Sequence, residues 1–224
     1  MSRLVVKVGG SVAKGSSTRA LLRDFVASSH EITVVHGAGP QISGEMRRRG
    51  LPVEFVGGRR VTTAAGLEVV RESFLAVNTA LCRAIGPRAV PLYGDEIGLL
   101  ARRVPALGLV GDPLPCRPAE IEAALGAGLI PVVAPLAKGP LNVNADEAAS
   151  ALAIGLGADK VVFLTDVPGL LLEGTVVPSI DAGDAQGLLD AGDLDGGIVP
   201  KLQAAVTAAK LGVRAEIGQT AVLA

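Results

Sequence analysis

The sequence predicts an α/β fold with a mainly parallel central sheet, on three observations. Short apolar runs rich in Val, Leu and Ile alternate with helical patterns along the chain, which is typical of strands covered by helices on both faces. Hydrophobic residues make up 49% of the chain and aromatic residues 2%, so we expect an aliphatic core. The 224 residues show no internal repeat, and they suffice for one domain or two closely fused lobes.

Composition and charge exclude several classes of protein. A net charge of −1 gives no basic surface for nucleic acid. No apolar run has membrane-spanning length, and the chain enters its first apolar run at Leu4 without a signal peptide. Cys82 and Cys116 stand apart from any CxxC or Cys/His cluster, which predicts neither a disulfide framework nor a zinc site. We therefore expect a cytoplasmic protein without nucleic-acid or membrane partners.

The first predicted strand, residues 4–8, contains Lys7 and ends at a glycine pair. Burying a lysine is costly unless it meets an anion or a carboxylate. The alternative is a lysine on an edge strand whose amine reaches solvent, and the fragment alone leaves both interpretations open. An amphipathic helix is predicted next, over residues 18–29.

A second strand, residues 32–35, precedes the glycine-rich turn 36–41 and a helix. A strand, a glycine-rich turn and a helix in succession can bind anions through backbone N–H groups and the helix dipole. A dinucleotide fingerprint would need glycine where Ile42 stands, so an oxidoreductase is disfavoured. We interpret His36 as a structural hydrogen-bonding residue, because no partner Ser or Cys motif is visible.

The middle of the chain begins with a loop at residues 53–63 that carries Arg59 and Arg60 side by side. Arginine suits carboxylate recognition, but a solvated surface pair is the simpler interpretation. A helix with a long apolar face is predicted over residues 66–85. Beyond it we predict strands at 89–93, 107–110 and 129–134, a helix at 118–126, and an irregular segment between the first two strands.

Residues 141–171 organise the rest of the chain. Asn142, Asn144 and Asp146 precede an alanine-rich helix that ends near Gly157, and Asn and Asp favour such helix starts. A fully buried strand is predicted at residues 161–164, followed by a turn at 165–169. Because ligands of open α/β sheets lie beyond the carboxyl ends of the strands, this turn is a candidate ligand site.

The final segment contains a predicted helix at 181–189, a notable loop at 193–201 and a helix that begins within it and covers 200–211. Two short strands, residues 214–217 and 220–223, close the chain. Lys201 would lie at the N-terminus of its helix, against the preference of the helix dipole for cations at the other end. We therefore expect an anion beside it. A functional boundary is expected near residues 135–140.

Two lysines, glycine turns after strands and an aspartate at a helix start suit phosphoryl transfer. That reaction depends on positioning and on cations that stabilise the spreading charge. Neither a P-loop nor the protein-kinase motif set is present, so a nucleotide enzyme of another lineage is expected.

Six motifs, taken in their order along the chain, indicate which lineage this is. They are KVGGS, VVHGAGPQI, GRRVT, NVNADEAA, FLTDVPGL and GGIVPKL, and together they span nearly the whole chain. In this order they resemble the amino acid kinase family and, within it, the acetylglutamate kinases. The resemblance implies a three-layer αβα sandwich, usually dimeric. An acyl substrate would lie on residues 1–135 and Mg-ATP on residues 136–224.

The resemblance implies a reaction and a set of site residues. The γ-carboxylate of N-acetyl-L-glutamate would attack the γ-phosphate of ATP, giving an acyl phosphate in arginine biosynthesis. Lys7 and Lys201 would stabilise the transferring group, and Asp146 would orient both lysines. Substrate would contact Ala38, Gly39, Arg60 and Asn142. Nucleotide would contact Gly9, Gly10, Asp166, Val167, Pro168, Gly169, Leu170, Leu171, Asp193, Leu194, Asp195, Gly196 and Gly197. Mg²⁺ would be carried by the ATP phosphates, with no metal site on the protein.

The chain departs from this family at three places. Ala38 stands where the family usually has glycine, and the segment between Ile217 and Gln219 is shorter than usual. The chain also starts directly at its first strand, without the N-terminal helix of arginine-inhibited hexameric relatives. We therefore expect an arginine-insensitive homodimer, and the sequence leaves open whether a PII-type regulator binds. Two rivals stay open: a sister kinase for carrier-linked aminoadipate or glutamate, and a catalytically weak regulatory paralogue.

Overall fold

The computed structural model describes residues 2–10, 24–165, 167–194 and 196–224. An eight-stranded sheet forms its centre, in the order β14-β16-β15-β11-β1-β2-β8-β5. In chain order these strands are β1 (Arg3–Val8), β2 (Glu31–His36), β5 (Ala89–Tyr93), β8 (Ile130–Ala134), β11 (Lys160–Leu164), β14 (Ser179–Asp181), β15 (Arg214–Ile217) and β16 (Thr220–Leu223). All neighbours pair in parallel except β15 and β16, which confirms the predicted fold class.

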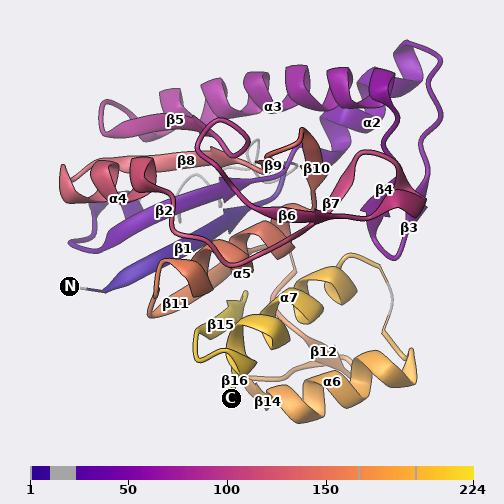
Figure 1. The fold of residues 1–224 in the computed structure, drawn as a ribbon. Coiled ribbons are helices and arrows are strands. Elements are labelled where there is room, and N and C mark those ends of the chain that lie inside the picture. Colours follow the sequence, from indigo (N-terminus) through magenta and orange to yellow (C-terminus); the bar gives the residue numbers. More distant parts are fainter. Residues whose placement is uncertain (1, 11–23, 166, 195) are drawn as a thin grey trace.

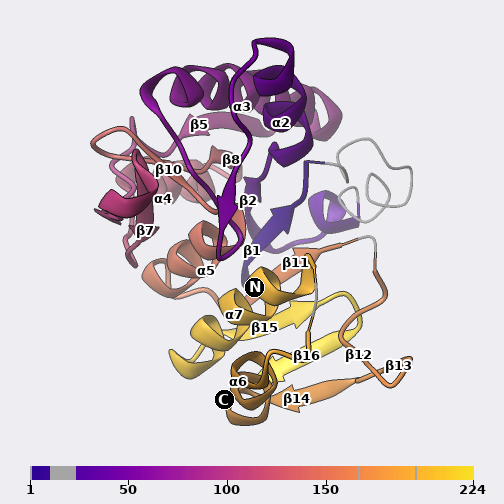
Figure 2. The same cartoon turned by 90° about the vertical axis from the view of Figure 1, so that its right-hand side faces the viewer.

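Helices cover both faces of the sheet and complete three layers (Figure 1). On one face lie α2 (Gly39–Arg48) and α3 (Ala64–Ile85), and α3 packs on β5 and β8. The other face is covered by α4 (Ala119–Gly126), α5 (Ala145–Gly155), α6 (Ala182–Ala191) and α7 (Ile198–Lys210). Figure 2 shows α6 and α7 beside the β14–β16 end of the sheet. The helix predicted at residues 18–29 is helical at 24–27, and residues 18–23 lie outside the described part.

The alternation of side chains along β1 divides the core into two apolar clusters. Leu4, Val6 and Val8 join the cluster beneath α2 and α3, whereas Val5 joins the cluster on the α5 and α7 side. Successive residues of a strand point to opposite faces, so Lys7 shares the face of Val5. The strand register therefore sends the Lys7 side chain towards α5.

A four-stranded sheet flanks the main one, in the order β6-β7-β10-β9. Its strands are β6 (Ala101–Arg103), β7 (Val110–Pro113), β9 (Leu136–Ala137) and β10 (Leu141–Val143). The prediction of a strand at 107–110 is wrong: a 3₁₀ turn, η2 (Pro105–Leu107), comes first, and Gly108 then turns the chain at φ +82°. The segment predicted to be irregular contains β6.

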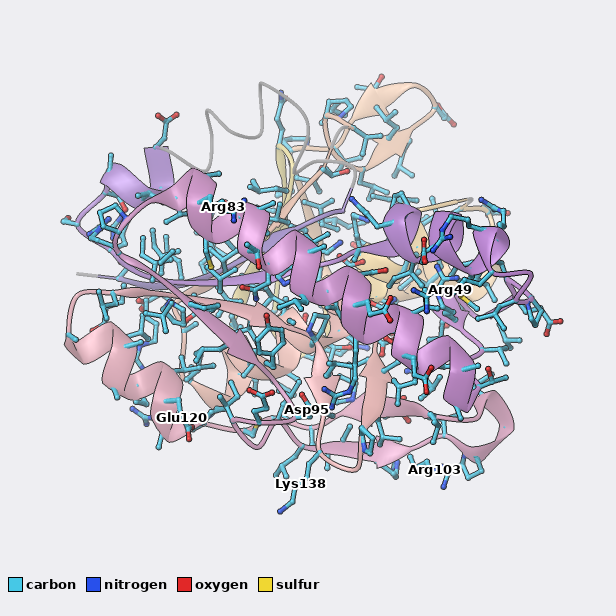
Figure 3. All side chains as sticks on the ribbon, turned by 90° about the horizontal axis from the view of Figure 1, so that it is seen from above. Arg49, Arg83, Asp95, Arg103, Glu120 and Lys138 are labelled. Carbon is cyan, nitrogen blue, oxygen red and sulfur yellow. The ribbon has the colours of Figure 1, made fainter. Side chains whose placement is uncertain are left out.

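Two small hairpins complete the fold. The segment predicted as a loop at 53–63 holds β3 (Phe55–Val56) and β4 (Arg59–Arg60), and β12 (Leu171–Leu172) pairs with β13 (Thr175–Val176). Seen from above, charged side chains such as Arg103 and Lys138 point outward from the edge of the molecule (Figure 3). Among the described residues, no helix is long and apolar enough to cross a membrane.

Candidate functional site

Lys7 and Asp146 form a buried ion pair at the centre of the molecule. Lys7 lies on β1, between β2 and β11, so the edge-strand interpretation is wrong. Its side chain is 6% exposed, and its Nζ lies 2.8 Å from Oδ1 of Asp146, whose side chain is 8% exposed. A buried charge is tolerated when it is paired, so the carboxylate accounts for the lysine inside this strand.

Asp146 also meets a second lysine. Its Oδ2 lies 3.8 Å from Nζ of Lys201, which donates a hydrogen bond of 3.2 Å to the Gly197 carbonyl. Lys201 is in the first turn of α7, as the sequence predicts. Two lysine amines therefore meet at one carboxylate, and cations held this close together suit an anionic ligand.

The start of α5 fixes Asp146 in this position. Asn144 is the N-cap, and its Oδ1 accepts the backbone N–H groups of Asp146 at 2.8 Å and Glu147 at 3.3 Å. This confirms the predicted helix start and its cap. Gly157 follows the helix with φ +62°, a conformation that glycine adopts without strain and that ends many helices.

The two glycine-rich turns approach each other beside Lys7. The Gly10 carbonyl accepts Nε2 of Gln41 at 2.9 Å, and a Cβ on Gly10 would lie 2.7 Å from Oε1 of that side chain and 3.0 Å from Cα of Ala38. Close packing against the backbone of residues 37 and 38 therefore favours glycine at position 10. Ala38 is the N-cap of α2 and offers no side-chain cap, so the first N–H groups of that helix stay available to an anion.

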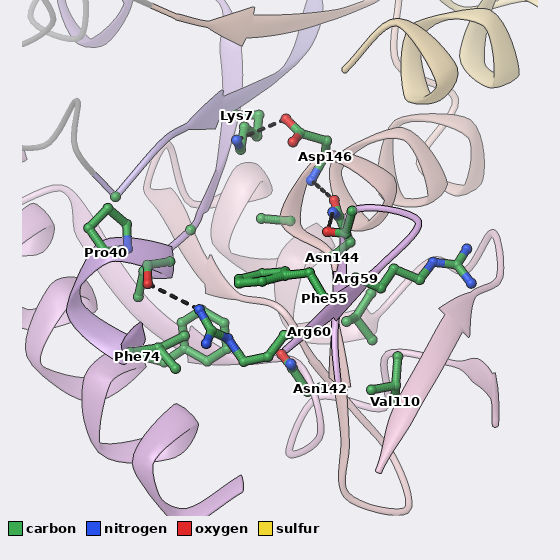
Figure 4. Close-up of a pocket in the computed structure, with 18 residues that line it drawn as sticks. Lys7, Pro40, Phe55, Arg59, Arg60, Phe74, Val110, Asn142, Asn144 and Asp146 are labelled. Atoms are coloured by element: carbon green, nitrogen blue, oxygen red, sulfur yellow. Dashed lines mark hydrogen bonds and ion pairs between the residues drawn. The ribbon is translucent and has the colours of Figure 1, made fainter. Parts of the chain in front are cut away.

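A pocket of about 250 Å³ opens between these turns, the β3–β4 hairpin and the start of α5. We call it the acyl pocket, after the acyl substrate expected from the sequence for several of its residues. In the view of Figure 4 the Lys7–Asp146 pair lies at one end, Arg60 lies at the other, and the Phe55 ring lies between them. Its lining includes the predicted residues Lys7, Gly10, Ala38, Gly39, Arg60, Asn142 and Asp146.

Arg60 is a buried cation at the wall of this pocket. It is 6% exposed, so the interpretation as a solvated surface pair is wrong. Its guanidinium donates to Ser43 Oγ at 2.7 Å and to the Gly39 carbonyl at 3.2 Å, and it lies 4.6 Å from the centre of the Phe55 ring. Among the described residues no carboxylate pairs with it. Burial, together with the charge of Arg47, lowers its pKa, as expected of a guanidinium that lacks an anion.

Asn142 reaches the same pocket from β10. Its Nδ2 donates to Thr62 Oγ1 at 3.0 Å, and the Thr62 hydroxyl donates to the Arg60 carbonyl at 2.9 Å. All three residues are buried. This chain of hydrogen bonds fixes the predicted asparagine relative to the predicted arginine, although Thr62 and Asn142 are 80 positions apart in the sequence.

A second pocket, of about 510 Å³, has Lys201 in its lining. We call it the nucleotide pocket, after the nucleotide contacts expected from the sequence for several of its residues. It is lined by Thr165, Val167, Gly169, Leu170, Leu171, Asp193, Leu194, Gly197, Ile198 and Lys201. Most of the nucleotide-binding residues expected from the sequence are therefore brought together here. Gly196 lies in the loop before α7 at φ +69°, and Gly9 precedes Gly10 beside the acyl pocket. Asp166 and Asp195 lie outside the described residues.

The β15–β16 hairpin supports the turn that lines the nucleotide pocket. The Thr220 hydroxyl accepts the N–H of Leu170 at 2.8 Å and donates to the Val177 carbonyl at 2.7 Å. The N–H of Gln219 donates to the Pro168 carbonyl at 2.7 Å. The short segment at 217–219 thus makes a tight hairpin that holds this turn in place.

Several residues of the acyl pocket were not predicted from the sequence. They are Gly37, Pro40, Ile42, Phe55, Gly58, Arg59, Phe74, Val110, Val143, Asn144 and Ala145. The sequence offers one signal for Phe55. Aromatic residues make up only 2% of the chain, and this one stands five positions before Arg60. Phe74 looks like any core position of its helix, and only the packing of α3 brings it to the pocket.

His36 has the structural role that the sequence predicts. Its ring is fully buried, its Nε2 lies 3.2 Å from Nδ2 of Asn78, and it packs edge-on against Phe74. Burial lowers its pKa from 6.5 to about 4. Because the amide N–H of Asn78 faces Nε2, the ring is held in its neutral form.

This burial predicts a pH-dependent stability. Below pH 6.5 the unfolded chain binds a proton at His36 while the folded chain does not until about pH 4. The free energy of unfolding is therefore expected to fall by about 3 kcal/mol over that range. Urea denaturation measured across it, with wild type and His36→Asn, checks this. The variant should lose that part of the pH dependence, and His30→Asn, at an exposed position, should keep it.

Comparison with known proteins identifies the class to which this fold and site belong. Residues 2–219 match the amino acid kinase family. The chain belongs to that family. It is 40% identical to the acetylglutamate kinase of Rubrobacter xylanophilus, over 97% of this chain and 88% of that protein. It is also 40% identical to the acetylglutamate kinase of Roseiflexus castenholzii, over 95% of this chain and 87% of that protein.

Solved structures agree with the fold. The protein smu.665 from Streptococcus mutans UA159 superposes with a TM-score of 0.89 and 27% identity, over 99% of this chain and 98% of that one. Carbamate kinase from Giardia lamblia, solved with AMP-PNP, gives a TM-score of 0.69 at 14% identity, over 99% of this chain and 98% of that one. At that identity the likeness concerns the fold alone.

Proposed function

We propose that this protein transfers the γ-phosphoryl group of ATP to the γ-carboxylate of N-acetyl-L-glutamate. One observation carries the proposal: Asp146 pairs with Lys7, which lines the acyl pocket, and with Lys201, which lines the nucleotide pocket. One carboxylate therefore joins a cation of each pocket, as transfer between two bound substrates requires. The acetylglutamate kinases that resemble the chain at 40% identity support this substrate.

The acyl pocket fits the proposed acceptor. Arg60 lacks a carboxylate partner among the described residues and would pair with the α-carboxylate of the substrate. Asn142 would bind the same molecule, and the apolar side chains of Phe55, Phe74 and Val110 would pack on its carbon atoms. The γ-carboxylate would then point towards Lys7, at the opposite end of the pocket.

In the proposed step a γ-carboxylate oxygen attacks the γ-phosphorus, and the bond from that phosphorus to the β,γ-bridging oxygen breaks. The products are the acyl phosphate and ADP. A carboxylate is already ionised at neutral pH, so no general base is needed, and Asp146 orients the two lysines instead. Lys7 and Lys201 stabilise the charge that spreads over the phosphoryl oxygens.

The glycines of the two pockets allow phosphate to approach the backbone, which fits ATP as the donor. No group of three or more His, Cys, Asp or Glu side chains among the described residues could hold a metal ion. We propose that Mg²⁺ arrives on the ATP phosphates, where it would neutralise charge. We also propose that residues 1–135 supply most of the acyl side and residues 136–224 the nucleotide side. The linings of the two pockets support that division.

A hydroxylamine trap tests the function. Purified protein is incubated with Mg-ATP, hydroxylamine and one candidate acceptor, and both hydroxamate and ADP are measured. We expect hydroxamate with N-acetyl-L-glutamate and none with glutamate, aspartate or N-acetylaminoadipate. Absence of product from folded protein would contradict the proposal, and product only with a carrier-linked substrate would favour the sister kinase. The expected homodimer and its insensitivity to arginine remain predictions, which light scattering and the same assay check.

Arg60→Met is expected to weaken substrate binding without lowering the stability of the fold. The variant removes the group that would hold the α-carboxylate, so the KM for N-acetyl-L-glutamate should rise by about 100-fold. It also removes a buried charge without an ionic partner, so the free energy of unfolding should stay level or rise by about 1 kcal/mol. Steady-state kinetics and urea denaturation measure both. A large loss of stability with unchanged KM would show that Arg60 is merely structural.

A further inference from the structure

The β3–β4 hairpin forms one wall of the acyl pocket, and its own contacts do not explain its stability. Its strands contribute two residue pairs, Phe55 with Arg60 and Val56 with Arg59. Phe55 and Val56 are 54% and 57% exposed, so little apolar surface is buried there. An isolated two-stranded hairpin is marginal at best. Other contacts must therefore hold it over the pocket.

Arg59 supplies the strongest of these contacts. Its Nε lies 2.9 Å from Oε1 of Glu147 on α5, and its Nη1 lies 2.5 Å from Oδ1 of Asp112 on β7. The side chains of Arg59, Asp112 and Glu147 are 26%, 27% and 20% exposed. These pairs are largely shielded from water, so they are screened less than an ordinary surface ion pair.

The tip of the hairpin makes two weaker contacts beside Arg59. The Gly58 carbonyl accepts Nδ2 of Asn144 at 3.5 Å, and a Cβ on Gly58 would lie 3.6 Å from Cβ of Pro200, the neighbour of Lys201. The hairpin therefore touches α5 at the turn that carries Asp146 and faces the first turn of α7. It bridges α5 and α7, the helices that hold Asp146 and Lys201 of the proposed catalytic cluster.

We infer that Arg59 is a positioning residue, which fastens the β3–β4 hairpin to Asp112 and Glu147 so that Arg60 and Phe55 face the acyl pocket before substrate binds. The identity of that substrate rests on the proposed function, whereas the fastening itself does not. Arg59 and Arg60 are neighbours on one strand, so they point in opposite directions. Arg59 pairs with two carboxylates of the protein, whereas Arg60, which bonds to Ser43 and Gly39, pairs with no carboxylate of the described residues and is left for an anionic ligand.

The charges around Arg59 explain why its loss would release the hairpin. Burial raises the pKa of Glu147, and the neighbouring charges of Asp112 and Asp146 raise it further, while Arg59 lowers it. Glu147 Oε2 is also buried and has no hydrogen-bond partner among the described residues. Without the guanidinium, Glu147 would lose its cation, and Asp112 would keep only Arg102 among the described residues, which lies 3.5 Å away and is 76% exposed. The site would then open to admit water.

Hydrogen exchange of the ligand-free protein tests the fastening directly. In Arg59→Leu the amides of residues 55–60 should exchange about tenfold faster or more, while those of the central sheet stay unchanged. Arg117→Leu is the matched control, because it removes an arginine that is 61% exposed and pairs with Glu122 away from the pocket. Glu147→Gln should give a smaller increase, because Arg59 keeps Asp112 as a partner, and the double variant should exchange no faster than Arg59→Leu alone. Unchanged exchange in Arg59→Leu would overturn the inference.

Kinetics then separate positioning from a general structural role. In Arg59→Leu the KM for N-acetyl-L-glutamate should rise about tenfold, with kcat and the KM for ATP changed less than about threefold. Equal changes in every parameter, or faster exchange throughout the chain, would overturn the inference. If the wild type does not phosphorylate N-acetyl-L-glutamate, the proposed function fails. The exchange experiment still decides the role of Arg59, because it needs no turnover.

Discussion

Lys201→Ala is expected to lower kcat by about three orders of magnitude while leaving the protein folded. Removing one preorganised cation from the path of a transferring phosphoryl group costs that much in comparable sites. The side chain is 17% exposed and lies at the start of a helix whose later turns form the core, so its removal leaves the packing intact. The hydroxamate assay under saturating substrates measures the effect.

The same helix supplies a matched control for Lys201→Ala. Lys210 is in the last turn of α7, where it donates to Gln186 Oε1 at 3.2 Å, and Lys210→Ala should keep wild-type kcat. Asp146→Asn should also lose activity, because both lysines would lose the carboxylate that orients them. If Lys201→Ala retained kcat within about tenfold, the assignment of Lys201 to the transferring group would be wrong.

The fold could be predicted from the sequence because its signals are local. Apolar runs, glycine turns and the Asn144 cap each act within a few residues, and the parallel order of the sheet follows from their alternation. The direction of the Lys7 side chain also follows from the alternation of side chains along β1, once Val5 is assigned to the face beneath α5. The strand predicted at 107–110 failed because Gly108 turns the chain where hydropathy alone suggests continuity.

The roles of Arg59 and Arg60 could not be predicted from the residues alone. Adjacent guanidinium groups look alike in a sequence, and their difference comes from partners far along the chain. Arg59 meets Glu147, 88 positions away, while Arg60 is buried without a carboxylate among the described residues. Burial of this kind depends on how β3, β4, β7 and α5 meet. The family resemblance identified Arg60 from its motif, and it said nothing of Arg59.

Gly155→Ala is expected to destabilise the protein by about 3 kcal/mol or more. A Cβ at this last residue of α5 would lie 2.1 Å from the carbonyl oxygen and 2.4 Å from the nitrogen of Cys116. Both atoms belong to the backbone, so no side chain can rotate away, and the helix or the segment before α4 must move. Urea denaturation at neutral pH measures the change in the free energy of unfolding.

Gly44→Ala is the matched control, since it also adds one methyl group to a helical glycine. A Cβ at Gly44, within α2, would meet nothing within 4 Å, so the substitution should stabilise the protein by up to about 1 kcal/mol. A lower free energy of unfolding in Gly155→Ala and a higher one in Gly44→Ala would show that Gly155 is needed for close packing. Helix propensity alone favours alanine at both positions. A loss below about 1 kcal/mol in Gly155→Ala would mean that the Cys116 segment yields easily. The segment would then be a poor support for α5, the helix whose first turn holds Asp146 between the two lysines.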